Sequence, residues 1–271
     1  MHLYKGETKV EATETRIKEL ANALYRAELD RKPIAPLTEK YPNLTPEDAY
    51  HIQLEWVKLK EKDGAIITGK KIGLTSKPMQ QLMGVNEPDY GHLFDYMMIS
   101  DKEAIKADEL LQPRIEAEVA FVLEKDLQGP GVTVADVLDA TKYVVPSIEV
   151  VDSRIENWKI KLQDTIADNG SSSRVVLGSK VTPVEGLDLQ LMGMVLEKNG
   201  QQINTGAGAA ALGHPAYAIA WLANKLSQFG ITLKAGEVVL PGAVAAAVNV
   251  KKGDFITAHF SGIGSVSVSF E

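Results

Sequence analysis

The chain has 271 residues and a formal net charge of −7, since 29 lysines and arginines stand against 36 aspartates and glutamates. No run of basic residues interrupts this balance, so we expect neither nucleic acid nor a membrane surface as a partner. The absence of cysteine excludes disulfides, thiolate catalysis and cysteine-bound zinc, and the five histidines are scattered, so a metal would have to be held by carboxylates.

The N-terminal third of the sequence has the pattern of amphipathic helices. Apolar residues recur at helical spacing between positions 17 and 27 and predict a helix over residues 12–29. Thr45 and Pro46, followed by two acidic residues, predict the start of a second helix, which Gly64 ends. The start of the chain lacks the apolar core of a signal peptide, and no stretch of about 18 apolar residues follows, so we expect a soluble cytoplasmic protein.

From residue 66 the pattern changes to short strand-like runs broken by glycine and proline. A helical turn is predicted near residues 77–83 and a helix over 215–229, ended by Gly230. The most strand-like runs are 114–125 and 143–153, and the tail after residue 236 reads as strands throughout. The composition therefore divides a helical N-terminal region, residues 1–65, from a β-rich body, residues 66–271.

Three acidic residues lie inside the two most strand-like runs. In a strand over 114–123, Glu116 and Glu118 share one face about 7 Å apart. Glu149 has a similar apolar setting between Ile148 and Val150. Burying ionised carboxylates is costly unless a cation compensates, and an all-oxygen set suits Mg²⁺ or Mn²⁺. The alternative is that Glu116 and Glu118 line the solvated face of an edge strand.

Seven blocks of the sequence carry a resemblance to a known family. They closely resemble the 2-oxopent-4-enoate hydratase and 4-oxalocrotonate decarboxylase family, within the fumarylacetoacetate hydrolase superfamily, and the likeness covers nearly the whole chain from about residue 15. The blocks are ITGKKIGLTSK (67–77), GVNEPDYGHLFDYM (84–97), QPRIEAEVAFVLEKDLQGPGVT (112–133), PSIEVVDSRIENWK (146–159), DTIADN (164–169), GAGAAALGHP (206–215) and GIGSVSVSF (262–270).

The resemblance implies an α+β fold: a mixed β-roll or barrel body with an N-terminal helical cap. It also implies a Mg²⁺ or Mn²⁺ site whose ligands are Glu116, Glu118 and Glu149. Lys71 matches the lysine of the family's glycine-rich block, where a charged lysine would stabilise developing enolate charge. Because successive side chains of a strand point to opposite faces, Lys70 fits a surface lysine better.

Further site residues follow from the same blocks. Asp89 matches a position associated with the active site of hydratases, although an aspartate in a Pro-Asp-Tyr-Gly segment is also a common turn-former. Asp168 and Ser171 are expected to be catalytic and Asn169 to bind substrate, with a satisfied loop network as the alternative for each. Arg154 is expected to pair with Asp152 or, less favoured, to reach a substrate carboxylate.

Three other positions invite a functional interpretation. The Gly206–Ala210 loop lacks the third glycine of a dinucleotide fingerprint and, on this pattern, a preceding strand, so we do not expect a nucleotide site there. His214 is read as a structural residue at a helix start rather than a base. Pro241 replaces the Thr or Ser that the family typically carries, which removes one expected hydroxyl.

The resemblance implies a lyase acting on a small 2-oxo-enoate, and two sister reactions fit it. The favoured one is decarboxylation of 2-oxohex-3-enedioate (4-oxalocrotonate) to 2-hydroxypenta-2,4-dienoate in meta-cleavage aromatic catabolism, partly because Arg174 offers a cation for the distal carboxylate. The alternative is hydration of 2-hydroxypentadienoate to 4-hydroxy-2-oxopentanoate. The family also implies a homo-oligomer and a complex with the sister hydratase or decarboxylase. The alternative to an enzyme is a non-catalytic subunit that scaffolds this partner.

Overall fold

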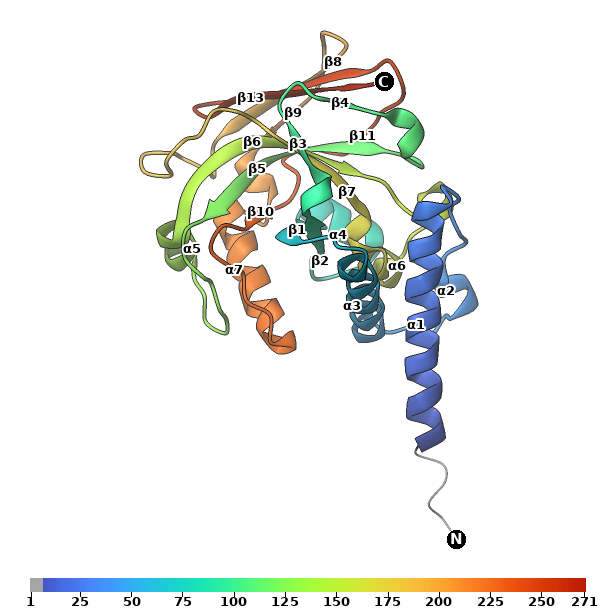
Figure 1. The fold of residues 1–271 in the computed structure, drawn as a ribbon. Coiled ribbons are helices and arrows are strands. Elements are labelled where there is room, and N and C mark those ends of the chain that lie inside the picture. Colours follow the sequence, from blue (N-terminus) through green and yellow to red (C-terminus); the bar gives the residue numbers. More distant parts are fainter. Residues whose placement is uncertain (1–6) are drawn as a thin grey trace.

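The structure is a computed structural model that describes residues 7–271, apart from the side chains of residues 7–12, 82 and 83 (Figure 1). The polar start of the chain lies outside this description. The helices of the described part are α1 (Glu7–Leu29), α2 (Leu37–Lys40), α3 (Pro46–Lys62), α4 (Lys77–Met83), α5 (Val134–Ala140), α6 (Leu162–Ala167) and α7 (Pro215–Leu226). None of them is long and apolar enough to cross a membrane.

The larger of two sheets has eight strands and contains both parallel and antiparallel pairs. Its strand order is β2-β1-β10-β5-β6-β7-β3, and β11 also pairs with β5. The strands are β1 (Ile67–Gly73), β2 (Asp89–Phe94), β3 (Met98–Ser100), β5 (Arg114–Leu123), β6 (Thr141–Val151), β7 (Ser172–Leu177), β10 (Val238–Leu240) and β11 (Val248–Asn249). This sheet confirms the α+β class with mixed strand pairing.

A five-stranded sheet covers one face of the larger sheet, and the helices lie on the other side (Figure 1). Its order is β4-β13-β12-β8-β9, and β12 and β13 contact β6. Its strands are β4 (Ala104–Ile105), β8 (Gly193–Lys198), β9 (Gln201–Ala207), β12 (Phe255–Phe260) and β13 (Gly264–Phe270). The two sheets bury a continuous apolar layer between them.

The predicted helices form, although α1 begins at Glu7 instead of residue 12, and α7 ends at Leu226, where a short 3-10 helix continues to Phe229. Thr45 and Asp48 make a reciprocal capping box at the start of α3. The side chain of His214 caps α7, accepting the backbone N–H of Ala216 at 3.1 Å, which confirms its structural role. Gly230, in the left-handed conformation, follows the turn after α7.

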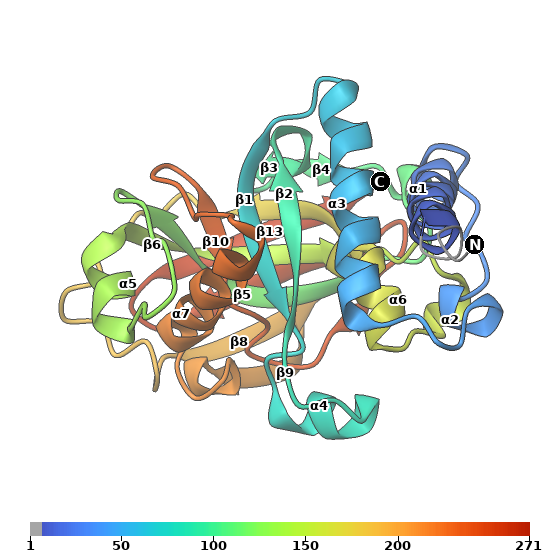
Figure 2. The same ribbon diagram turned by 90° about the horizontal axis from the view of Figure 1, so that it is seen from below.

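The helical N-terminal region packs onto the β-rich body. Figure 2 shows α3 running beside β2, and α3 contacts both α1 and α6. Ile34 makes a short parallel bridge to Ile155 of the body. The division at residue 65 stays an expectation, but these contacts hold the two parts together.

One sequence-based expectation about the Gly206–Ala210 loop is wrong. A strand, β9, does lead into this loop. However, β9 pairs antiparallel with β8 and does not belong to the parallel strand-helix-strand unit that a dinucleotide site requires. The loop therefore still has no feature of a nucleotide site.

Candidate active site

The pairing of β5 with β6 brings the three predicted metal ligands together. Glu116 lies directly opposite Glu149, and Glu118 lies opposite Ser147, so the three carboxylates share one face of the larger sheet. One oxygen from each lies within 4.8 Å of the others. Glu118 and Glu149 are fully buried, whereas Glu116 is partly exposed. The group therefore lies inside the protein and meets solvent on the side of Glu116.

Several carboxylate oxygens of this group have no hydrogen-bond partner among the described residues. Glu118 accepts the backbone N–H of Gly242 through Oε2 at 2.8 Å, and its Oε1 has no hydrogen bond among the described residues. The same holds for both oxygens of Glu149. Gly242 has a φ of 111°, and a side chain there would overlap Thr75, so this close approach requires glycine. Buried carboxylate oxygens that lie close together without hydrogen bonds are the pattern expected of a metal site.

Burial makes it costly to keep all three carboxylates of this group ionised. Burial raises the pKa of Glu149 to about 7 despite the attraction of Lys71. Burial, Glu149 and Glu116 together raise the pKa of Glu118 well above its ordinary value. A divalent ion bound by these oxygens would offset the cost of holding them ionised. The all-oxygen donor set fits Mg²⁺ or Mn²⁺.

Lys71 extends from β1 into the same group. Its Nζ donates to the carbonyl oxygen of Gly170 at 3.0 Å and lies 3.4 Å from Oε2 of Glu149. Burial by itself would lower the pKa of Lys71, but the surrounding carboxylates, Glu149 above all, outweigh this and raise it. The lysine is therefore held in its charged form beside the three carboxylates.

The expectation that Lys70 is a surface lysine is wrong. Lys70 points to the opposite side of β1 from Lys71, as alternation predicts, but it is 2% exposed and pairs with Glu237 at 2.8 Å. The reason is that β1 lies inside the sheet, between β2 and β10, with structure covering both of its faces. Alternation decides which face a side chain takes but not whether that face is buried.

Asp89, the first residue of β2, lies close to Lys71. It is 1% exposed and lies across from Gly73 on β1. Its Oδ2 accepts the hydroxyl of Thr165 at 2.9 Å, and its Oδ1 has no hydrogen-bond partner among the described residues. A Cβ built on Gly73 would lie 2.1 Å from this Oδ1 and 3.3 Å from Nζ of Lys71, so the two groups meet above that glycine. The structure thus places five of the expected residues in one cluster.

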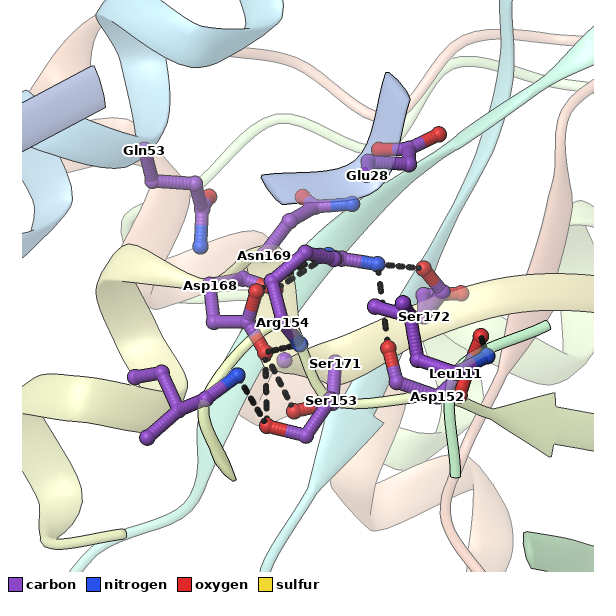
Figure 3. A network of polar contacts seen from close by, with 12 residues as sticks. Glu28, Gln53, Leu111, Asp152, Ser153, Arg154, Asp168, Asn169, Ser171 and Ser172 are labelled. Carbon is purple, nitrogen blue, oxygen red and sulfur yellow. Dashed lines mark hydrogen bonds and ion pairs between the residues drawn. The ribbon is translucent and has the colours of Figure 1, made fainter. Parts of the chain in front are cut away.

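Asp168 and Ser171 are placed in a neighbouring hydrogen-bond network (Figure 3). Asp168 pairs with Nε of Arg154 at 2.6 Å and accepts the hydroxyls of Ser153 and Ser171 at 3.1 and 2.8 Å. Arg154 therefore pairs with Asp168, not with the carboxylate of Asp152, to which it donates only at the backbone oxygen. Both side chains are thus bonded within this network, and the catalytic roles expected for Asp168 and Ser171 stay predictions.

Asn169 is also hydrogen-bonded within the chain. Its side-chain oxygen accepts the N–H of His92 at 2.7 Å, and its side-chain nitrogen donates to the carbonyl of His92 at 2.9 Å. This pair of bonds ties the loop after α6 to β2. The neighbouring Gly170, with a φ of 59°, presents the carbonyl that receives Lys71. The loop supports the site rather than offering these side chains to a substrate.

Arg174 is not brought to the three glutamates. It lies opposite Val150, the residue next to Glu149 on β6. Its side chain therefore projects from the face of the sheet opposite to that of Glu149. There it lies 3.6 Å from Glu109. The role expected for Arg174, holding a distal substrate carboxylate, therefore has no support in the geometry of this chain.

The sequence interpretation gave no role to three residues that the structure places at the site. Thr165 bonds Asp89, and Ser172, whose buried hydroxyl has no partner among the described residues, lies near enough to lower the pKa of Glu149. Arg114 shares the face of Glu116, two residues away on β5. Its Nε donates to Asn249 at 3.1 Å, and its guanidinium carbon lies 4.3 Å from the ring centroid of Trp158. The sequence could have indicated Arg114, because residues two apart in a strand share a face and Arg114 therefore lies beside Glu116.

Comparisons with known proteins show the family of the chain. Residues 53–270 match the family model described as fumarylacetoacetate (FAA) hydrolase C-terminal. The chain is 50% identical to a 2-hydroxyhexa-2,4-dienoate hydratase of Comamonas testosteroni, over 91% of this chain and 94% of the relative. It is 43% identical to a 4-oxalocrotonate decarboxylase of Pseudomonas sp. (strain CF600), over 95% and 98%.

A solved structure matches over nearly the whole chain. The 4-oxalocrotonate decarboxylase of Pseudomonas putida G7, complexed with magnesium and adipate, superposes with a TM-score of 0.93 at 41% identity. The superposition covers 95% of this chain and 98% of the decarboxylase. The fold around the three glutamates is thus that of a metal-binding relative.

Proposed function

The chain belongs to the fumarylacetoacetate hydrolase family, and we propose that it is a divalent-metal-dependent lyase acting on a small conjugated 2-oxo acid. One observation carries the proposal: the carboxylates of three glutamates converge beside a charged lysine and Asp89. Among the described residues, buried oxygens of Glu118 and Glu149 and Oδ1 of Asp89 have no hydrogen-bond partner. Glu116, Glu118 and Glu149 would hold Mg²⁺ or Mn²⁺. The metal, when bound, supplies Lewis-acid polarisation of the substrate's keto oxygen.

The residues of the chain perform the remaining steps. Lys71, fixed by Gly170 and held charged, stabilises negative charge that develops on the substrate's oxygen. Asp89 presents Oδ1 near Lys71 and can take or return a proton at that atom. The partly exposed Glu116 marks the side from which substrate enters. These roles need no contribution from Asp168, Asn169 or Ser171 beyond holding the loop.

We propose hydration as the first candidate reaction, which reverses the preference drawn from the sequence. In this reaction 2-hydroxypenta-2,4-dienoate takes up one water molecule to give 4-hydroxy-2-oxopentanoate. The enol oxygen at C2 loses its proton and C3 gains one, while the proton and hydroxide of water add at C5 and C4. The hydratase named above shares more residues with this chain than the decarboxylase does, 50% against 43%. The argument for decarboxylation from Arg174 is also lost, because that side chain leaves the opposite face of the sheet.

Decarboxylation of 2-oxohex-3-enedioate is the second candidate, and Arg114 favours it. That substrate carries a distal carboxylate, which needs a cation some distance from the metal. Arg114 lies about 7 Å along β5 from Glu116, on the same face, and its two terminal nitrogens make no hydrogen bond recorded among the described residues. The TM-score of 0.93 to a solved decarboxylase adds support.

A two-substrate assay tests the proposal. Purified protein with Mg²⁺ should consume 2-hydroxypenta-2,4-dienoate and form 4-hydroxy-2-oxopentanoate, and chelation should abolish the reaction. Release of CO₂ from 2-oxohex-3-enedioate, without hydration, would replace the first candidate with the second. Absence of both reactions in metal-loaded protein would overturn the proposed lyase function and favour a scaffold role.

Three further expectations stay predictions. They are the homo-oligomer, its complex with a sister hydratase or decarboxylase, and the cytoplasmic location. A sedimentation measurement on the purified chain, alone and with such a partner, addresses the first two.

A further inference from the structure

The two oxygens of the Asp89 carboxylate have different surroundings. Oδ2 accepts one hydrogen bond, from the hydroxyl of Thr165 at 2.9 Å. Oδ1 has no partner among the described residues, although the side chain is only 1% exposed. Oδ1 also lies within about 5.4 Å of Nζ of Lys71, the sum of their two distances to the Cβ position of Gly73. One oxygen is thus anchored, and the other faces the cluster.

The anchor comes from a short helix that is itself held in place. Thr165 lies on α6 and is 6% exposed. The preceding residue, Asp164, accepts the backbone N–H and the hydroxyl of Thr38 at 3.0 and 2.7 Å, which ties α6 to α2. The loop that follows α6 supplies the carbonyl of Gly170 that receives Lys71. One segment, residues 165–170, therefore orients both Asp89 and Lys71.

We propose that Thr165 is a positioning residue for the reaction: its hydroxyl fixes the Asp89 carboxylate so that Oδ1 faces the substrate and exchanges a proton there. The inference rests on the proposed lyase function. A carboxylate held by one hydrogen bond keeps a single orientation, whereas a free one would rotate about its terminal torsion, which is a broad well. Alternatively, Thr165 only fills space beneath Asp89, and its hydroxyl merely satisfies a buried acceptor.

Valine and serine variants separate these two roles. Thr165→Val keeps the shape and removes the donor, so kcat with Mg²⁺ and the accepted substrate should fall about 10- to 100-fold while KM changes less than about 2-fold. Thr165→Ser keeps the donor and should restore most of kcat. The matched control is Thr141→Val, which removes an equally buried threonine hydrogen bond, to the carbonyl of Val137 at the start of β6 and away from the cluster. Its kcat should stay within about 2-fold of wild type.

A double-mutant cycle with Asp89→Asn supplies the decisive measurement. If Thr165 acts through Asp89, Thr165→Val should lower kcat less than about 2-fold in the Asp89→Asn background. The same cycle measured on urea unfolding of the metal-free protein should show coupling between the two residues, and this readout does not depend on turnover. Equal losses of kcat in both backgrounds, equal losses from Thr165→Val and Thr141→Val, or no rescue by serine would each overturn the inference. An inactive wild type would instead overturn the proposed function.

Discussion

Glu149→Gln should make the metal-free protein more stable at neutral and alkaline pH. Burial raises the pKa of Glu149 from 4.5 to about 7 in the folded state. Between these two values the folded protein holds a proton that the unfolded chain releases, so its stability falls as pH rises through this window. At 1.36 kcal/mol per pKa unit, the total loss is about 3 kcal/mol. Glutamine carries no such charge and avoids the loss.

Thermal unfolding with a chelator measures this effect. At pH 8 the variant should melt higher than wild type by roughly 5–10 °C, and the difference should shrink toward pH 5. Adding Mn²⁺ should raise the Tm of wild type, because the ion binds only the folded state, and should not raise that of the variant. A lower Tm for the metal-free variant at pH 8, or an undiminished Mn²⁺ effect on it, would refute the reasoning that the three carboxylates form an incomplete site without a cation.

The remaining predictions concern the positive charges of the chain. Lys71→Met should lower kcat on the order of 100- to 1,000-fold without weakening Mn²⁺ binding in calorimetry, since the lost charge repels the ion; loss of binding would contradict the assigned role. Arg114→Met should raise KM for 2-oxohex-3-enedioate about 10-fold, while Arg174→Met, on the opposite face, should change it less than about 2-fold; equal effects would argue against Arg114 as the carboxylate contact. Arg154→Met should cost about 3–5 kcal/mol in urea unfolding, because Asp168 stays buried without its partner, and a cost below about 1 kcal/mol would contradict that account.

Expectations that rest on strand periodicity agree with the structure. Glu116 and Glu118 share a face because they are two residues apart in β5, and Lys70 and Lys71 take opposite faces because they are adjacent in β1. The capping residue Thr45 starts α3 where its side chain can accept a backbone N–H. Each of these features depends on neighbours within a few positions of the chain.

Expectations that require pairing between distant segments needed the structure. Whether Lys70 is buried depends on Glu237, which lies 167 positions away in the sequence. The face taken by Arg174 relative to Glu149 depends on the register of β6 with β7, and a shift of one residue would reverse it. Asp168 lies in a block that resembles the family, but only the folded chain shows that its carboxylate pairs with Arg154.

By itself the sequence determined an acidic composition without thiols, a family resemblance, and a pair of glutamates on one strand face. The tertiary structure decided that Glu149 lies opposite Glu116, that Lys71 and Asp89 meet above Gly73, and which loop side chains are already bonded. The physical reason is that side-chain alternation is a local property of the backbone. Which faces meet is set by burial and by the closing of hydrogen bonds across the whole chain.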